Sequence, residues 1–215
     1  FIVIYPQGYK LETQLTNSSS HWNSGAWTIG SNIDDVSFIS TLIEIIASKV
    51  SIDRNRVYSS GMSNGGFMSY HLACNLSSKI AAVASVTGSM SKETYEDCNP
   101  THSTSILQVH GTIDATVPFE GNSALGMRSI NDVMDYWKLY DACGIAPISS
   151  VTDYFDIEIS VQHDTYLNCL NDVQVELYKI EGMGHRWPNK QRYGISATEK
   201  IWEFINLYDI NGKIN

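Results

Sequence analysis

Three residues of the sequence are of the types that together perform nucleophilic catalysis. Ser63 stands in GMSNG, Asp114 in HGTIDATVP and His185 in GMGHRWP. A serine hydroxyl becomes a nucleophile when a histidine takes its proton, and a carboxylate holds that histidine in the required tautomer. The chemistry that these residues would perform is attack on a carbonyl carbon, followed by hydrolysis of a covalent acyl intermediate.

The GMSNG segment fits G-x-S-x-G, the pattern of a sharp turn from a strand into a helix. We expect Gly61 and Gly65 to remove Cβ atoms where the strand and the helix approach each other. The turn would direct the first N–H groups of the helix toward Ser63, so we expect the backbone N–H of Asn64 to donate to an oxyanion. The alternative for this segment is an ordinary glycine-rich turn.

Other residues compete for the roles of acid and base. The rival histidines are His71, His102, His110 and His163, and the rival aspartates are Asp153 and Asp156. His110 ends an apolar segment and is expected to be a hydrogen-bonded structural residue, and His71 is expected to pack within a helix. Asp153 and Asp156 lie in a strand-like region, whereas Asp114 and His185 each follow the end of a predicted strand. The pair Asp34 and Asp35 is better explained by the first turn of a helix, where carboxylates favour the dipole.

The elements that would position these residues alternate between strands and helices. Strands are predicted over 1–5, 55–60, 81–88, 105–111 and 173–180, with strand-like alternation over 151–162. Helices are predicted from 34 to about 50 and over 65–76, 129–142 and 197–208, the first with an apolar stripe of Phe38, Leu42, Ile45 and Ile46. This order predicts a single α/β domain over residues 1–215, with a mainly parallel sheet covered by helices on both faces. The site is then expected at the carboxyl ends of the strands.

Composition excludes several other classes of function. The chain has 215 residues, a net charge of -9 and no basic segment, so we expect no nucleic-acid partner. No apolar stretch approaches the roughly 20 residues of a membrane-spanning helix, so no membrane association is expected. No two histidines stand at metal-ligand spacing with a carboxylate, so we expect no metal and no cofactor.

The cysteines and the N-terminus indicate an exported protein. Cys74, Cys98, Cys143 and Cys169 form no CxxC pair. Of the three ways to pair them, we favour the nearest neighbours, with four buried free thiols as the alternative. The sequence begins at Phe1 within an apolar segment, which suggests a mature or excised part of a longer precursor. N-x-S sequons at Asn17 and Asn75 are compatible with export.

The motifs also resemble a known family, the secreted esterases that include polyhydroxybutyrate depolymerases, feruloyl esterases and acetylxylan esterases. The similarity lies in YPQG (5–8), DDVSFI (34–39), IDRNRVYSSGMSNGGFMSYHLAC (52–74), HGTIDATVPFEG (110–121), the W…C of 137–143 and GMGHRWP (182–188). It implies an α/β-hydrolase fold with Ser63, Asp114 and His185 as the catalytic triad. It also favours disulfides Cys74–Cys98 and Cys143–Cys169.

The sequence departs from this family at its start. Members usually carry further strands and an HG-containing loop before the YPQG strand, and that loop supplies the second oxyanion donor. These N-terminal strands are absent from the 215 residues, so no second donor can be named. One of the absent strands would lie between the strands predicted at 1–5 and 55–60.

The resemblance implies a serine carboxylesterase acting on a possibly polymeric ester. Feruloyl or acetyl esters of plant polysaccharide are the first expectation, and hydroxyalkanoate polyesters the second. A serine peptidase, a non-catalytic carbohydrate-binding module and an inactive relative are the remaining alternatives. Trp187, two residues from His185, is a candidate for the wall of a substrate pocket. Trp22 and Trp27, in a long polar segment, are weaker candidates for contact with a polymer.

Overall fold

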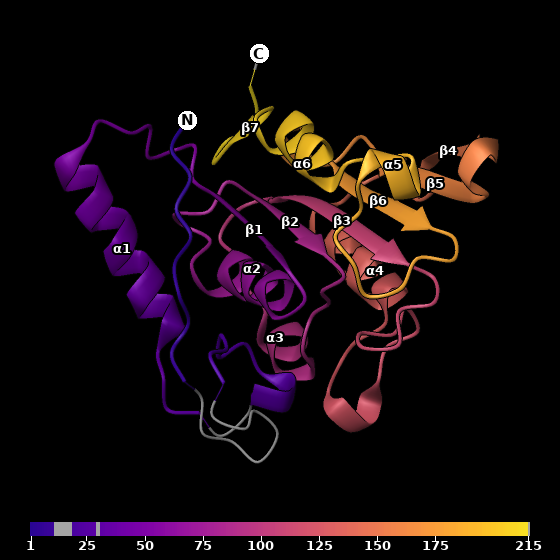
Figure 1. Ribbon diagram of the computed structural model, residues 1–215. Coiled ribbons are helices and arrows are strands. Elements are labelled where there is room, and N and C mark those ends of the chain that lie inside the picture. Colours follow the sequence, from indigo (N-terminus) through magenta and orange to yellow (C-terminus); the bar gives the residue numbers. More distant parts are fainter. Residues whose placement is uncertain (11–18, 29–30, 215) are drawn as a thin grey trace.

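The computed structural model describes residues 1–10, 19–28 and 31–214. Its centre is a six-stranded sheet in the order β1-β2-β3-β6-β5-β4 (Figure 1). The strands are β1 (Tyr58–Met62), β2 (Ala82–Val86), β3 (Ser105–Gly111), β4 (Ile148–Tyr154), β5 (Ile159–Tyr166) and β6 (Val175–Ile180). The strands β1, β2, β3 and β6 are parallel, and β5 and β4 add an antiparallel hairpin. The prediction of a mainly parallel sheet is confirmed.

Most of the helices begin after a polar side chain that accepts a hydrogen bond from one of their first N–H groups. The helices are α1 (Asp35–Lys49), α2 (Asn64–Asn75), α3 (Lys92–Asp97), α4 (Ile130–Tyr140), α5 (Lys190–Tyr193) and α6 (Ala197–Ile205). Single 3-10 turns are η1 (Ala26–Thr28), η2 (Ser123–Leu125), η3 (Phe155–Ile157) and η4 (Leu170–Asp172), and a short hairpin joins β7 (Tyr208–Asp209) to β8 (Gly212–Lys213). Asp34, Ser91 and Ser129 each accept a hydrogen bond from a backbone N–H three residues later, as N-cap residues do. Asp34 therefore caps α1.

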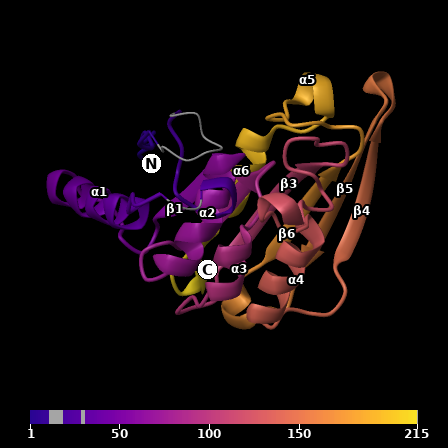
Figure 2. The same cartoon turned by 90° about the horizontal axis from the view of Figure 1, so that it is seen from below.

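Two apolar layers enclose the sheet. On one face, residues of α2 and α4 such as Tyr70 and Trp137 pack on Val83 and Ile106. On the other face, α6 packs on alternate residues of β2 and β3, which include Leu107. Figure 1 and Figure 2 show these helices on opposite sides of the sheet. The buried sheet provides the rigid support on which the loops at its carboxyl edge are held.

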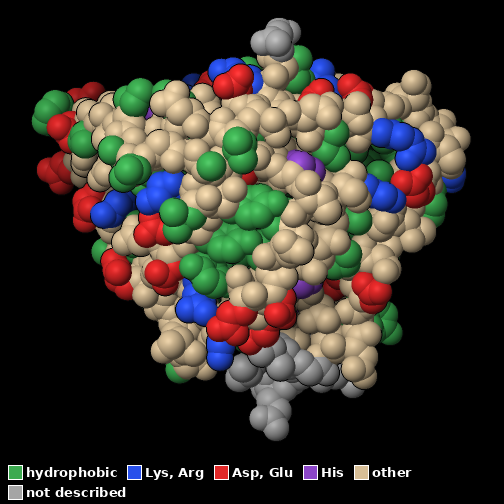
Figure 3. Space-filling model, turned by 180° about the vertical axis from the view of Figure 1, so that it is seen from behind, with side chains coloured by type: hydrophobic (Ala, Val, Ile, Leu, Met, Phe, Trp, Pro, Cys, Tyr) green, Lys and Arg blue, Asp and Glu red, His purple; other side chains and the backbone are tan. Residues whose placement is uncertain are grey.

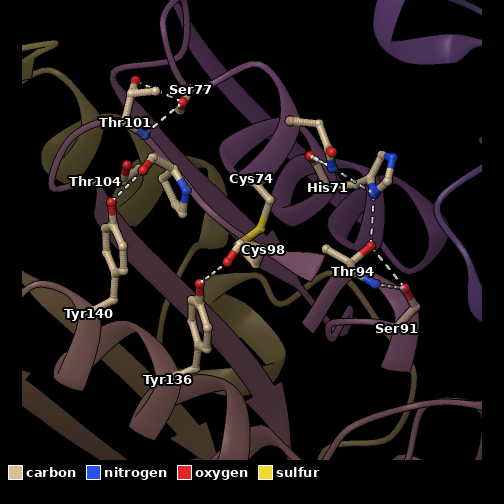
Figure 4. Close-up of a disulfide and its surroundings, with 12 residues drawn as sticks. His71, Cys74, Ser77, Ser91, Thr94, Cys98, Thr101, Thr104, Tyr136 and Tyr140 are labelled. Atoms are coloured by element: carbon tan, nitrogen blue, oxygen red, sulfur yellow. Dashed lines mark hydrogen bonds between the residues drawn. A yellow bond between two sulfur atoms is a disulfide. The ribbon is translucent and has the colours of Figure 1, made fainter. Parts of the chain in front are cut away.

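Both disulfides have the favoured pairing. Cys74 of α2 is bonded to Cys98, directly after α3, and Cys143 is bonded to Cys169. Around the first bond, the Tyr136 hydroxyl donates to the carbonyl oxygen of Cys98 at 2.9 Å (Figure 4). The first bond joins α2 to the end of α3, and the second joins the segment after α4 to the residue before η4.

The strand predicted over residues 1–5 is wrong. No part of this segment belongs to a strand, and its side chains are exposed, with Phe1 at 90% and Tyr5 at 91%. The sheet ends at β1, and the structure gives these residues no ladder with it. An apolar segment forms a strand only when a neighbouring strand pairs with its backbone. The apolar pattern of residues 1–5 does not report whether such a neighbour is present. Residues 11–18 and 29–30 lie outside the described residues. They include the sequon at Asn17 and part of the long polar segment that carries Trp22 and Trp27.

Two further expectations are corrected by the structure. The predicted stripe of α1 is partly exposed, with Phe38 at 44% and Ile45 at 46%, and the face that packs on the core instead carries Val36, Ile39 and Ile43. The alternating region over 151–162 is a hairpin rather than one strand, because Glu158 adopts a left-handed conformation with φ of 54° at the turn between β4 and β5.

The surface carries a mixture of polar and apolar side chains. Viewed from behind, hydrophobic side chains gather near the centre of the face, with acidic and basic side chains around them (Figure 3). Among the helices of the described residues, none has the length and apolar character required to cross a bilayer.

Candidate active site

The three chemically interesting residues follow three strands of the parallel part of the sheet. Ser63 comes directly after β1, Asp114 three residues after β3 and His185 five residues after β6. Parallel strands end at the same edge of a sheet, and β3 and β6 are hydrogen-bonded neighbours. The fold therefore brings the segments of the three residues to one edge, as expected for an α/β fold.

Ser63 stands on a strained turn between β1 and α2. Its φ of 55° and ψ of -122° lie in a region that a residue with a Cβ rarely occupies. The backbone on both sides fixes this conformation, because Ser63 N–H donates to the Val86 carbonyl at 2.9 Å and Ser63 C=O accepts from Gly66 and Phe67 at 2.8 and 3.0 Å. The turn has the features of a nucleophile elbow.

Only one of the two flanking glycines is required for the close approach of strand and helix. A Cβ on Gly61 would lie 2.5 Å from the backbone carbon of Gly65, far inside van der Waals contact. A Cβ on Gly65 would meet nothing within 4 Å. The expectation for Gly65 is therefore corrected: its backbone makes the close contact, whereas its own missing side chain would point into open space.

The backbone and the side chain of Asn64 have different surroundings. Its backbone N–H, the first of α2, has no hydrogen-bond partner among the described residues. Its side-chain amide holds Trp22 at both backbone groups, since Oδ1 accepts from Trp22 N–H at 2.7 Å and Nδ2 donates to Trp22 C=O at 3.1 Å. The N–H is available for a developing oxyanion, and the side chain fastens a distant segment next to Ser63.

Asp114 and His185 are in direct contact. His185 Nδ1 donates to Asp114 Oδ2 at 2.8 Å, and the carboxylate is buried. The other oxygen, Oδ1, accepts from the N–H groups of Thr116 and Val117, each at 2.9 Å. Because Nδ1 of His185 is engaged by the carboxylate, Nε2 is the nitrogen left for a substrate or a nucleophile.

The carboxylate is held in its ionised form. Burial alone would raise the pKa of Asp114, but the hydrogen bond from His185 and those from the N–H groups of Val117 and Thr116 lower it below its usual value. An ionised carboxylate can both fix the tautomer of His185 and stabilise the positive charge that this histidine acquires when it takes a proton.

The loops that carry the acid and the histidine are joined to each other. The Ile113 N–H donates to the Met183 carbonyl at 3.2 Å, and Gly182 N–H donates to Thr112 Oγ1 at 3.0 Å. A Cβ on Gly111 would lie 2.0 Å from the Met183 carbonyl oxygen, so only glycine allows this approach. Contacts with the end of β3 and with the residues that follow it therefore hold the segment around His185 in place.

His110 is the hydrogen-bonded structural residue that the sequence predicts. Its contacts support the turn that carries Asp114, which the sequence did not indicate. Its Nε2 donates to the Val117 carbonyl at 2.8 Å, and its Nδ1 accepts from Gln108 Nε2 at 2.9 Å. The Tyr70 hydroxyl donates to Gln108 Oε1 at 2.7 Å. Burial lowers the pKa of His110, which keeps the ring neutral in this chain of hydrogen bonds. The chain ends at Val117, whose N–H holds Asp114.

The rival residues have other partners. His102 contacts the carbonyl oxygens of Ser77 and Ser103, His163 contacts Glu176, and His71 contacts Thr94. Asp153 and Asp156 lie near the tip of the β4–β5 hairpin, beside Lys190. Among these residues the structure joins only His185 with Asp114 in a carboxylate–imidazole hydrogen bond at the carboxyl edge.

Two of the three tryptophans expected to contact substrate, Trp187 and Trp22, lie in different surroundings. Trp187 is 37% exposed, and its Nε1 donates to Thr198 Oγ1 at 3.1 Å, near the start of α6. The Trp22 ring stacks on Phe38 of α1, with ring centroids 6.4 Å apart. Trp22 is thus engaged in packing with its ring and in the clamp of Asn64 with its backbone.

The arrangement has the parts needed for acyl transfer. The Ser63 hydroxyl has no hydrogen-bond partner among the described residues, so it is not yet joined to His185. Such contacts are often long in the absence of a substrate and tighten in the reacting complex. In the described part of the chain, no three His, Cys, Asp or Glu side chains are grouped as metal ligands.

Comparison with known proteins points to esterases. Residues 31–136 match the phospholipase/carboxylesterase family model. Feruloyl esterase B of Piromyces equi is 29% identical over 74% of this chain and 31% of its own length. The bifunctional acetylxylan esterase/xylanase of Neocallimastix patriciarum is 24% identical over the whole of this chain and 28% of its own length. The chain thus spans less than a third of the length of either relative.

A solved structure supports the same fold. The acetyl xylan esterase from Aspergillus awamori superposes with a TM-score of 0.57 at 15% identity, over 93% of this chain and 73% of that one. At that identity the likeness concerns the fold alone. Taken with the mainly parallel sheet and the turn at Ser63, it shows that the chain has an α/β-hydrolase fold.

Proposed function

We propose that this protein is a serine carboxylic ester hydrolase in which Ser63, His185 and Asp114 form the catalytic triad. The observation that carries the proposal is the 2.8 Å hydrogen bond between His185 and Asp114 at the sheet edge where Ser63 stands on its strained turn. The match to a carboxylesterase family model supports ester hydrolysis as the reaction class.

In the proposed mechanism, His185 Nε2 accepts the proton of the Ser63 hydroxyl as Oγ attacks the ester carbonyl carbon. The negative charge moves to the carbonyl oxygen, where the backbone N–H of Asn64 donates to it. Collapse of this intermediate expels the alcohol, which takes the proton from His185, and leaves an acyl group on Ser63. Water activated by His185 then releases the carboxylic acid and restores the serine.

The proposed substrates are feruloyl or acetyl esters of plant polysaccharide. The names of the two relatives in sequence supply this substrate class, because they are a feruloyl esterase and an acetylxylan esterase. We also propose that the protein acts outside the cell, which its two disulfides favour because such bonds persist in oxidising compartments.

The test is a panel of substrates assayed with the native chain and with Ser63→Ala. The panel contains 4-nitrophenyl acetate and butyrate, methyl ferulate, acetylated xylan, a hydroxybutyrate polymer and a peptide anilide. We expect turnover of the aryl or polysaccharide esters, none of the anilide, and loss of all turnover in Ser63→Ala with an unchanged circular dichroism spectrum. Residual turnover in Ser63→Ala would refute the triad. Preferential cleavage of the polymer or the anilide would reassign the substrate class.

A further inference from the structure

The segment Trp22–Thr28, called the 22–28 segment below, is irregular but held firmly beside Ser63. Gly25 and Ala26 adopt left-handed conformations with φ of 81° and 53°. For a residue with a Cβ such as Ala26, this conformation is strained and persists only where surrounding contacts impose it. Those contacts come from side chains of other elements.

Each part of the 22–28 segment is bound by a different element. The clamp of Asn64 holds Trp22, Asp35 Oδ2 accepts from the N–H of Asn23 at 2.7 Å, and Glu93 Oε2 accepts from the N–H of Ala26 at 2.9 Å. These side chains belong to α2, α1 and α3. An irregular segment bound at three points by three helices is a preorganised part of the fold and not a passive connection.

The 22–28 segment places an indole ring over an apolar cluster behind the catalytic residues. Trp27 meets Phe67 edge to face, with ring centroids 4.9 Å apart, and Phe67 packs with Val117 and Met127 in a cluster separate from the two main cores. Trp27 is half-buried, whereas the other three are buried. Figure 2 shows the turn η1, which contains Trp27, next to α2.

The same cluster is connected to both ends of the proposed triad. Phe67 N–H donates to the Ser63 carbonyl at 3.0 Å, and Val117 N–H donates to Asp114 Oδ1 at 2.9 Å. The cluster therefore lies between the nucleophile turn and the acid turn. A partly exposed aromatic side chain at such a place offers a flat apolar surface to a group attached to the reacting carbonyl.

We propose that Trp27, positioned by the Asn64 clamp, forms a wall of the acyl subsite and favours esters with an aromatic acyl group over acetyl esters. This inference rests on the proposed function, since it names the residue that selects the acyl group in the same site. Asn64 is then a positioning residue through its side chain, in addition to its backbone N–H.

The experiment compares two esters with the same leaving group, 4-nitrophenyl ferulate and 4-nitrophenyl acetate. Trp27→Ala is expected to lower kcat/KM for the ferulate by about 10- to 100-fold, the range for an apolar contact in a binding pocket. The change for the acetate is expected to stay within about threefold, because the acetyl group is too small to reach the ring. Trp27→Phe should restore most of the loss, since it keeps an aromatic face.

Two further variants make the result specific. Trp202→Ala removes a tryptophan that is 40% exposed on α6, outside the proposed subsite, and is expected to change neither rate. Asn64→Ala should lower the ratio of ferulate to acetate rates in the same direction as Trp27→Ala, because the 22–28 segment loses its clamp. Thermal denaturation of every variant shows whether the fold is kept.

The outcomes separate this inference from the proposed function. Equal losses for both esters in Trp27→Ala would overturn the acyl subsite while leaving an esterase. A native chain that hydrolyses the acetate and not the ferulate would do the same. If Trp27→Ala fails to fold, an unchanged rate ratio in Trp27→Leu, which removes the aromatic face, would overturn it. Turnover that survives Ser63→Ala would instead defeat the proposed function.

Discussion

At the scale of single residues, Asp114 is the best-defined group of the site. Its carboxylate is buried and accepts from His185 on one oxygen and from Thr116 and Val117 on the other. Each of these donors requires an acceptor, and only an ionised carboxylate satisfies all three. The contacts therefore fix the orientation of the His185 imidazole.

Replacing this carboxylate tests the orientation directly. Asp114→Asn keeps the size of the side chain but introduces an amide donor, which conflicts with the N–H groups that now meet the carboxylate. We expect His185 to adopt the wrong tautomer and kcat on 4-nitrophenyl acetate to fall on the order of 10⁴-fold.

Asp153→Asn is the matched control for this prediction, because Asp153 is the aspartate of the β4–β5 hairpin that competes with Asp114 in the sequence. It should leave kcat within about twofold, as is usual for a substitution at an exposed position. A near-normal rate in Asp114→Asn would move the acid to another residue.

At the scale of elements, the site depends on two close approaches of backbone. The strand β1 meets the start of α2 at Gly61, and the end of β3 meets the β6–α5 loop at Gly111. Side chains are excluded from both contacts. The geometry between nucleophile, acid and histidine is thus determined by how tightly these elements pack.

The first of these contacts can be tested by a pair of alanine substitutions. Gly61→Ala places a Cβ against the Gly65 backbone, which cannot move without disturbing Ser63. We expect a loss of about 1–3 kcal/mol in the free energy of unfolding, typical of overpacking, together with a fall in kcat. Denaturation in urea measures the first effect.

Gly65→Ala provides the comparison from the same turn. It lies in α2, its φ is not positive, and its Cβ would meet nothing, so its free energy of unfolding should stay equal or rise by up to about 1 kcal/mol. Equal losses in both variants would contradict the assignment of the close contact to Gly61.

At the scale of the whole molecule, two disulfides and one buried carboxyl group affect stability away from the site. Cys74–Cys98 and Cys143–Cys169 close segments with sequence separations of 24 and 26. Asp141, at the end of α4, is fully buried, and within the described part of the chain its Oδ2 has no hydrogen-bond partner. The disulfides stabilise the fold, whereas the carboxyl group of Asp141 destabilises it when that group is ionised.

Removal of either disulfide should be costly. Restriction of the unfolded chain by loops of this size corresponds to about 3 kcal/mol each. The double variants Cys74→Ser with Cys98→Ser, and Cys143→Ser with Cys169→Ser, should each lower the free energy of unfolding by about this amount in urea. Unchanged stability of the native chain in the presence of reductant would contradict the prediction.

Asp141 should make the molecule less stable as the pH rises. Burial raises the pKa of Asp141 to about 7, although hydrogen bonds from Thr104 and Ser103 act in the opposite direction. Between the ordinary value of 3.8 and about 7, the folded state retains a proton that the unfolded state has released. The contribution of Asp141 to the free energy of unfolding is therefore fully present below pH 3.8 and is lost as the pH rises through about 7.

Asp141→Asn removes this titration, and its new Nδ2 can occupy the place of the unpaired Oδ2. Thermal denaturation at about pH 5 and about pH 8 should show that the variant gains more stability over the native chain at the higher pH. An equal difference between the two proteins at both pH values would show that Asp141 is not the group responsible.

The sequence alone determined the kinds and order of the reactive residues and most of the elements that hold them. The prediction for β3 agreed residue by residue, because a short segment with several apolar residues, bounded by turn residues, indicates a buried strand. The sheet type followed from the alternation of strands and helices, since that order leaves few ways to bury both faces. Ser63, Asp114 and His185 stood out because each came just after such a strand.

Only the tertiary structure decided which groups meet. Residues 1–5 have the composition of a strand but no paired neighbour, and α1 packs on a face that its own periodicity did not indicate. The clamp between Asn64 and Trp22 joins residues 42 positions apart, and the bond between His185 and Asp114 joins residues 71 apart. Local patterns report local backbone preferences, whereas hydrogen bonds across such separations exist only after the sheet has brought the loops to one edge.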